Sequence, residues 1–186
     1  MKKSIITLLT LSLILGLIGC GNTIKNEEEI IQDLQNQCDI IQQHDLKISN
    51  LEMTNRKTDT KGKSDTVYCT ITAQNENMKY LCDYTLNYFL YDQGWILDSI
   101  DRDNKQFVPL HSPITLSQVY EDSKQELEVI NYEYQTNFSF DREEIKLDNN
   151  THLFYFTNDT KTLQFVIDYD FDGKWYLHGY NMEKLN

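Results

Sequence analysis

A helical spacing of apolar residues marks the first folded part of the chain. Apolar side chains recur there at intervals of three and four: Ile30, Ile31, Leu34, Cys38 and Ile41. Such spacing places them on one face of a helix. Asn26 followed by Glu29 is a capping-box pattern, which marks a helix start. The pattern predicts one helix from about residue 26 to His44.

Alternating runs that are typical of β-strands follow this helix. They cover residues 46–57, 65–74, 79–91 and 95–101. Polar turn sequences separate the runs, at residues 59–65, 75–77 and 92–94. Short polar turns join neighbouring antiparallel strands, so this part predicts a four-stranded antiparallel sheet.

The second half of the chain has the same order in shorter form. It predicts a helix near residues 115–123 and strands near 127–138, 152–157, 162–171 and 174–181. Residues 48–53 resemble 129–134 at an offset of 81, and residues 92–97 resemble 172–177 at an offset of 80. A shared offset indicates an internal repeat. We therefore predict an α+β protein with two tandem repeats, 26–104 and a shortened 105–186, each a helix followed by a roughly four-stranded antiparallel sheet.

The second of these matches centres on a turn followed by tryptophan. Gly94 and Gly173 would let the chain reverse, because glycine tolerates a positive φ. We expect Trp95 and Trp175 to occupy equivalent places, each opening the last strand of its unit. Strand alternation would then bury each ring against the helix of its own unit.

The acidic residues before the second turn resemble part of a calcium loop. Asp168, Asp170, Asp172 and Gly173 match its first, third, fifth and sixth positions. The twelfth position requires a bidentate glutamate and is Gly179 here. The sequence therefore favours a β-hairpin, and we expect no metal site and no cofactor.

The N-terminus carries the pattern of a secretory signal. Lys2 and Lys3 precede an apolar run over residues 5–18, which is too short for a confident membrane span. The sequence Leu-Ile-Gly-Cys that ends at Cys20 resembles the lipobox of bacterial lipoproteins. The resemblance implies a cleaved signal peptide at residues 1–19, lipid on the Cys20 thiol and a tether at residues 20–25. An uncleaved anchor helix is the alternative.

Charge narrows the class of partner. The formal net charge is −12, and removal of Lys2 and Lys3 with residues 1–19 makes it −14. Such a chain is a poor ligand for nucleic acid, whose phosphates need clustered lysine and arginine. It also lacks general attraction to anionic lipid, so the lipid on Cys20 would attach it to the extracytoplasmic face of the cell membrane.

The remaining cysteines leave a disulfide open. If residues 75–76 form a two-residue hairpin loop, Cys69 lies opposite Cys82, and a cross-strand bridge is allowed. A longer loop would change the register and separate the two thiols. Cys38 lies on the apolar helix stripe, which indicates a buried thiol.

Regularly spaced tyrosines are the candidate binding residues. Tyr80, Tyr84 and Tyr88 fall at every fourth position of one predicted strand and therefore share a face. That face could be an aromatic platform for a sugar or protein partner, or it could pack against the helix. The junction near residues 101–113 is the other place where we expect ligand contact. No catalytic residues are assigned, because the four histidines are scattered and no nucleophile motif accompanies them.

A helix followed by four antiparallel strands, twice, resembles cystatin-like and NTF2-like modules of uncharacterised lipoproteins in clostridia-like Gram-positive bacteria. The part of this sequence that most resembles those modules is the Asp-x-Gly-Trp-x-Leu turn at residues 92–97. The resemblance carries no function by itself, and two classes stay open. The first is a non-catalytic binding module of the cell envelope with a protein or glycan partner, a class that includes an inhibitor resembling tandem-repeat β-lactamase inhibitor proteins. The alternative is a small NTF2-like enzyme or ligand-binding protein that uses a carboxylate in a cavity. The Gln-x-Val-x-Gly segment of cystatin inhibitors is absent from the sequence.

Lipidation of Cys20 is directly testable. Mass spectrometry of the membrane fraction should detect an acylated peptide that begins at Cys20, because cleavage follows thiol modification. The Cys20→Ala protein should lose this peptide and its attachment to the membrane. An intact peptide starting at Met1, or a Cys20→Ala protein that stays equally membrane-bound, would contradict the prediction.

Overall fold

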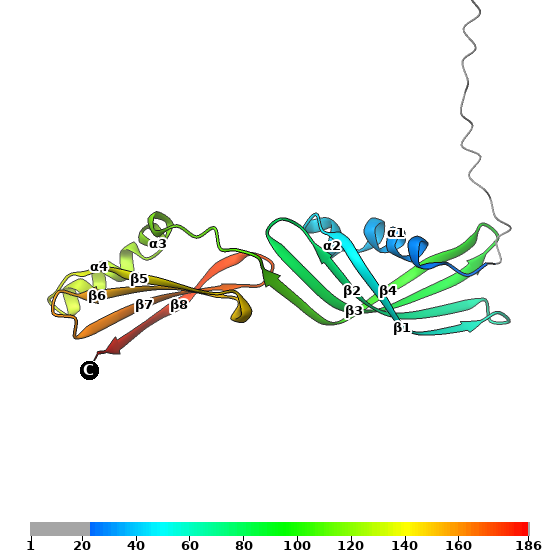
Figure 1. The fold of residues 1–186 in the computed structure, drawn as a ribbon. Coiled ribbons are helices and arrows are strands. Elements are labelled where there is room, and N and C mark those ends of the chain that lie inside the picture. The colour runs from blue at the N-terminus through cyan, green and yellow to red at the C-terminus, as the bar shows by residue number, and fades with distance from the viewer. Residues whose placement is uncertain (1–22, 186) are drawn as a thin grey trace, which may run out of the picture.

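The computed structural model describes residues 23–185, which form two α+β units lying end to end (Figure 1). Each unit has a four-stranded antiparallel sheet in sequential strand order, with two helices over one face. The first unit comprises α1 (Glu27–Gln37), α2 (Asp39–Gln43), β1 (Lys47–Asp59), β2 (Ser64–Gln74), β3 (Met78–Tyr91) and β4 (Gly94–Pro109). The second unit comprises α3 (Leu116–Asp122), α4 (Lys124–Glu133), β5 (Phe138–Lys146), the 3-10 helix η1 (Leu147–Asn149), β6 (Thr151–Asn158), β7 (Leu163–Phe171) and β8 (Trp175–Lys184). The predicted α+β class is confirmed, because each unit combines helices with a four-stranded antiparallel sheet.

The first helix begins where its capping pattern placed it. The Asn26 side chain accepts a hydrogen bond from the Glu29 amide, and the Glu29 side chain accepts one from the Asn26 amide. The helix ends earlier than predicted, because Cys38 adopts an extended backbone conformation and separates α1 from α2. The apolar stripe nevertheless continues across the break to Ile41, which is fully buried.

The first sheet extends beyond residue 104, where the sequence placed the end of the first repeat. Pro109 at the end of β4 still pairs with Met78 on β3. Residues 101–106 of β4 are all exposed and mostly charged or polar. An edge strand that faces solvent on both sides lacks the alternating pattern by which a strand is recognised.

The three candidate platform tyrosines are buried, which overturns the platform interpretation. Tyr80, Tyr84 and Tyr88 are 0%, 2% and 0% exposed. They share one core with the buried residues of α1 and α2. The face that the three tyrosines share is therefore the face that the helices cover, and it offers no surface to a ligand.

The predicted strand at residues 127–138 is wrong. Residues 124–133 form α4, and β5 begins only at Phe138. Leu127 and Ile130 are buried three positions apart and continue the helical stripe that starts at Val119. The β-branched and aromatic composition favoured a strand, but burial of this stripe against the sheet decides for a helix. The match between residues 48–53 and 129–134 therefore equates a strand with a helix.

The other sequence match corresponds to similar structure in both units. Residues 92–97 and 172–177 each contain a tight reversal, between β3 and β4 and between β7 and β8. Gly94 and Gly173 adopt φ of 111° and 78°, values that other residues rarely adopt. Trp95 lies near the start of β4 and Trp175 at the start of β8, as predicted.

The first of these tryptophans is a core residue. Trp95 is 6% exposed, whereas its neighbour Ile96 points to the other face and is 38% exposed. Truncation of a buried aromatic leaves a cavity, so Trp95→Ala should lower the free energy of unfolding by about 3–5 kcal/mol. The control Ile96→Ala should lower it by about 0.5 kcal/mol or less. Urea denaturation followed by circular dichroism measures both, and equal losses would contradict the assignment of Trp95 to the core.

Candidate binding groove between the two units

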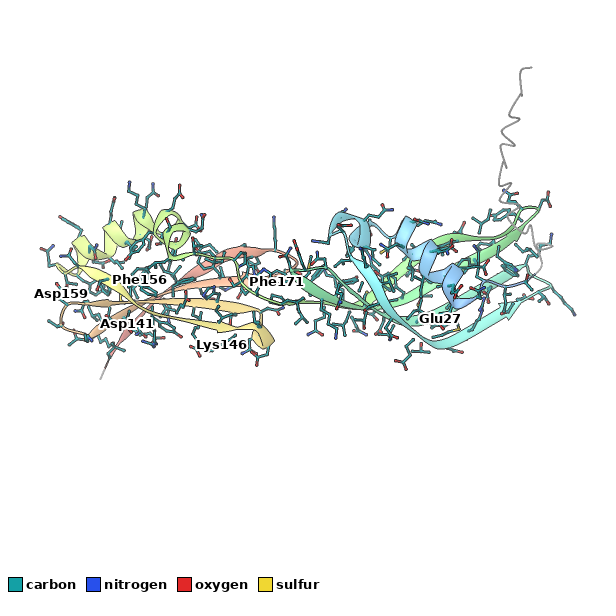
Figure 2. All side chains as sticks on the ribbon, turned by 45° about the horizontal axis from the view of Figure 1, so that its top comes forward. Glu27, Asp141, Lys146, Phe156, Asp159 and Phe171 are labelled. Carbon is teal, nitrogen blue, oxygen red and sulfur yellow. The ribbon has the colours of Figure 1, made fainter. Side chains whose placement is uncertain are left out.

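An open groove of about 1120 Å³ lies where the two units meet. The first unit contributes the connection from α2 to β1 and the turn between β2 and β3. The second unit contributes the β7–β8 turn, and the linker between the units adds residues 111, 113 and 114. Figure 2 shows Phe171 at this junction, between Glu27 near one end of the molecule and Asp159 at the other. Among the lining residues are His44, Lys47, Glu76, His111, Lys174 and Trp175.

Docking of the β7–β8 turn onto the first sheet creates the groove. Phe171 ends β7 but packs within the core of the first unit, where it is 7% exposed. Phe107 of β4 belongs to the same core. The Asn150 side-chain amide donates a hydrogen bond of 2.9 Å to the Phe107 carbonyl oxygen. Apolar burial and this hydrogen bond hold the two sheets together.

The turn glycine also serves this contact. A Cβ atom at Gly173 would lie 3.0 Å from Cε1 of His44 and 3.5 Å from Cζ of Phe107. The glycine that the sequence assigned to the turn is therefore required twice, for its positive φ and for the close approach of His44.

Trp175 occupies the junction rather than only the core of its own unit. Its indole N–H donates to the His111 carbonyl oxygen over 3.2 Å. Its ring centroid lies 5.2 Å from that of Phe171 and 6.2 Å from that of His152. The ring is half-buried and packs against both cores. The predicted burial against the helices of one unit is incomplete, because β8 begins where the units meet.

A buried histidine anchors the linker beside the groove. His152 is 1% exposed, and its Nδ1 lies 2.8 Å from Oγ of Ser112 in the linker. Its Nε2 lies 3.5 Å from Oε2 of Glu143 and has no hydrogen bond of good geometry. Burial lowers the pKa of His152, and the nearby Glu143 carboxylate opposes that shift only in part. The ring is therefore neutral at neutral pH and joins the linker to β6.

These three residues do not make a catalytic site. Ser112 lines neither the groove nor the two smaller cavities of about 580 and 340 Å³, although its neighbours His111 and Pro113 face the groove. The Ser112 hydroxyl points to a ring that solvent does not reach. A nucleophile needs space for a substrate beside its oxygen, so the arrangement is a structural anchor.

The cysteines follow the second of the two predicted alternatives, in which a longer loop separates Cys69 from Cys82, and Cys38 is buried as predicted. The β2–β3 pairing begins with Gln74 opposite Lys79, two residues beyond the partner that a two-residue loop would give, and it places Cys69 opposite Tyr84 and Cys82 opposite Ile71. Cys38, Cys69 and Cys82 are free buried thiols in the described chain. Burial raises the pKa of Cys69 to about 12, so this thiol stays protonated. The bridge between Cys69 and Cys82 is therefore not formed.

Two buried tyrosine hydroxyl groups contact partners within this first core. The Tyr84 hydroxyl lies 3.2 Å from Sγ of Cys38 and 3.1 Å from the Tyr80 hydroxyl. Burial raises the pKa of both tyrosines, which stay neutral. These contacts satisfy the polar groups of Tyr80, Tyr84 and Cys38, whereas the buried Tyr88 hydroxyl and Trp95 indole N–H have no hydrogen-bond partner among the described residues.

The acidic run forms the hairpin that the sequence favoured. Asp168 and Asp170 lie on β7, and Asp172 lies in the turn that leads to β8. Asp170 pairs with His178 over 2.9 Å. Within residues 23–185 no group of three or more histidine, cysteine or acidic side chains is arranged to hold a metal ion. The absence of calcium binding stays a prediction.

Some predictions cannot be placed on this structure. Cys20 and the signal segment lie outside the described residues. Among residues 23–185, no helix is long and apolar enough to cross a membrane. The chain matches no known protein-family model, and no curated protein or solved structure is similar enough to match it. The function of the groove therefore follows only from the chemistry of its lining residues.

The buried histidine predicts a dependence of stability on pH. Unfolded His152 takes up a proton below about pH 6.5, whereas the folded ring does so only at lower pH. The unfolded state binds more protons in this window, so the free energy of unfolding should fall as the pH falls through it. Urea denaturation between pH 7 and pH 5.5 measures the slope. His152→Asn should reduce the slope, and exposed His178→Asn is the control; equal slopes in wild type and His152→Asn would contradict the prediction.

Proposed function

We propose that the protein is a lipid-anchored binding protein on the extracytoplasmic face of the cell membrane and that the inter-unit groove is its binding site. The lipobox pattern ending at Cys20 supports the anchor. The groove is the observation that carries the proposed binding role, because its volume suits several linked groups of a polar ligand. The rest of the first unit has a filled core.

The groove's chemistry favours a glycan of the cell envelope. Gln43, Gln74 and Asn77 present exposed amides along its first wall. Trp175 and Phe171 supply apolar surface from the second unit. Amides beside an aromatic ring can bond sugar hydroxyls while the ring covers the apolar face of a sugar.

The charges of the groove fit the same class of ligand. Lys47 and Lys174 are offset by Asp45 and Glu76. An anionic ligand such as a nucleotide would need clustered cations, and a lipid tail would need an apolar lining. A neutral polar oligomer needs neither, which supports a glycan over both.

The enzyme alternative has less support. It requires a desolvated carboxylate inside a cavity. Burial raises the pKa of Asp168, but this residue lines neither the groove nor the cavities of about 580 and 340 Å³. Hydrogen bonds from Thr70 and Asn104 lower the pKa of Asp83, the acid that lines a second cavity of about 580 Å³. That acid is ionised and exposed, unlike a buried general acid.

We further infer that the two units are tandem copies of one module similar to cystatin-like and NTF2-like proteins. The order of two helices and four antiparallel strands in each unit supports this. The similar turns at residues 92–97 and 172–177 are the second support. Pairing of two modules produces a joint, and the joint supplies the groove.

Glycan binding can be measured by calorimetry with the mature protein in detergent and uncharged N-acetylglucosamine oligomers as soluble glycan fragments. Gln74→Ala should weaken binding roughly three- to tenfold, which corresponds to one lost hydrogen bond. Gln106→Ala is the matched control, because Gln106 is exposed on β4 but does not line the groove. No binding of the fragments, or equal effects of both variants, would refute the groove as a glycan site.

A further inference from the structure

One end of the first unit carries an exposed apolar surface beside the point where the chain enters the fold. We name it the tip surface. Its apolar members are Ile24, Phe89, Tyr91 and Ile96, which are 38%, 39%, 51% and 38% exposed. Phe89 and Ile96 are direct cross-strand partners, so their side chains share one face of the β3–β4 hairpin.

The start of the described chain is fixed to this end. Arg56 donates a hydrogen bond of 2.8 Å to the Lys25 carbonyl oxygen. Its guanidinium also pairs with Asp65, which is 1% exposed, over 2.6 Å. Buried ion pairs with several hydrogen bonds have defined geometry. Lys25 is therefore held against the β1–β2 hairpin.

The two hairpins of the first unit end together. The Leu90 amide donates to the Lys63 carbonyl oxygen over 2.9 Å, which joins the end of β3 to the β1–β2 turn. Figure 1 shows both turns at the same end of the molecule as the start of α1, away from the second unit. The tip surface and the chain entry therefore face the same direction.

The short stretch of chain between Cys20 and Lys25 limits how far this end can lie from the membrane. Five peptide steps separate Cys20 from Lys25. Fully extended, they span at most about 17 Å. If Cys20 carries lipid, as the proposed function holds, Lys25 cannot move farther than this from the membrane. The tip surface is then the part of the protein that meets the lipid.

The charge of the hairpin turns at this end is more compatible with anionic lipid than the charge of the rest of the molecule. The two turns and their flanks carry Lys57, Lys61 and Lys63 against Asp59 and Asp92. The formal charge of the whole chain is −12, so most of the negative charge lies elsewhere. Glu27, Glu28 and Glu29 at the start of α1 remain near this end, on the helix side. Anionic lipid would therefore repel the rest of the chain and favour contact through the hairpin turns.

We propose that the tip surface rests on the membrane, with Phe89, Tyr91 and Ile96 in the headgroup region, so that the protein stands on this end. Aromatic side chains with one polar edge are favoured at this depth. This inference rests on the proposed lipid anchor. The groove lies at the opposite end of β3, and a strand of 14 residues spans about 45 Å. The groove is thereby held in the envelope space, away from the lipid.

Brominated lipids, which quench tryptophan emission only at short range, test this orientation. The lipidated Phe89→Trp protein is reconstituted in vesicles of phosphatidylglycerol and phosphatidylethanolamine, with plain or brominated acyl chains. Its added emission should be lower in the brominated vesicles. Tyr132→Trp is the matched control, because Tyr132 is 80% exposed on α4 of the second unit. Its added emission should be the same in both. Tyr91→Trp is a second reporter if Phe89→Trp does not fold.

The outcomes separate the two proposals. Equal emission of both tip reporters in plain and brominated vesicles, with the protein bound through lipidated Cys20, overturns the orientation and leaves the anchor intact. Quenching of Tyr132→Trp to the same extent as Phe89→Trp also overturns the orientation. A protein whose Cys20 carries no lipid overturns the anchor, and the orientation fails with it. The mass of the N-terminal peptide distinguishes this last case.

Discussion

The arrangement of the molecule depends on the docking of one β-turn against the end of a neighbouring sheet. The turn between β7 and β8 places Phe171 in the core of the first unit and leaves room for His44 only because residue 173 is a glycine. This contact fixes the distance between the two sheets. The groove follows from it, since two rounded units that touch at one point leave a hollow beside the contact. Trp175 is half-buried for the same reason, because β8 starts at this joint.

A second constraint keeps the joint in one geometry. The linker is held through Ser112 to a histidine that solvent does not reach, while the Trp175 indole holds the neighbouring His111 carbonyl oxygen. A buried neutral ring with a hydrogen bond is stable, but a buried charge without a full partner is costly. The linker is thus ordered before any ligand arrives, and a preformed groove loses less conformational entropy on binding. A fall in pH acts on the same histidine, His152, because protonation would place a charge on its buried ring.

Side chains fill the core of the first unit, so the proposed contacts with lipid and ligand lie at its two ends. Tyr80, Tyr84 and Cys38 contact one another in the core, and the sheet face beneath the helices is buried. The two candidate contact surfaces of this unit are the hairpin end near the chain entry and the opposite end at the joint. In the proposed orientation, one of these ends meets the membrane and the other holds the groove. The long strands β3 and β4 thereby keep the membrane attachment and the groove at opposite ends of the unit. In one compact domain the two would lie side by side.

The sequence by itself determined the features that depend on near neighbours. The Asn26–Glu29 cap, the burial of alternate residues in β2 and β3, and the reversals at Gly94 and Gly173 follow from contacts within a few residues. Only the tertiary structure decided features that depend on distant partners. The register of β2 with β3 differs by two residues from the predicted one and places Cys69 opposite Tyr84, and α4 formed where composition favoured a strand. The groove was least predictable, because it combines His44 with Trp175, and no local pattern records which distant surfaces will meet. The reason is physical: short-range hydrogen bonding and alternation are encoded locally, whereas register and docking minimise exposed apolar area over the whole chain.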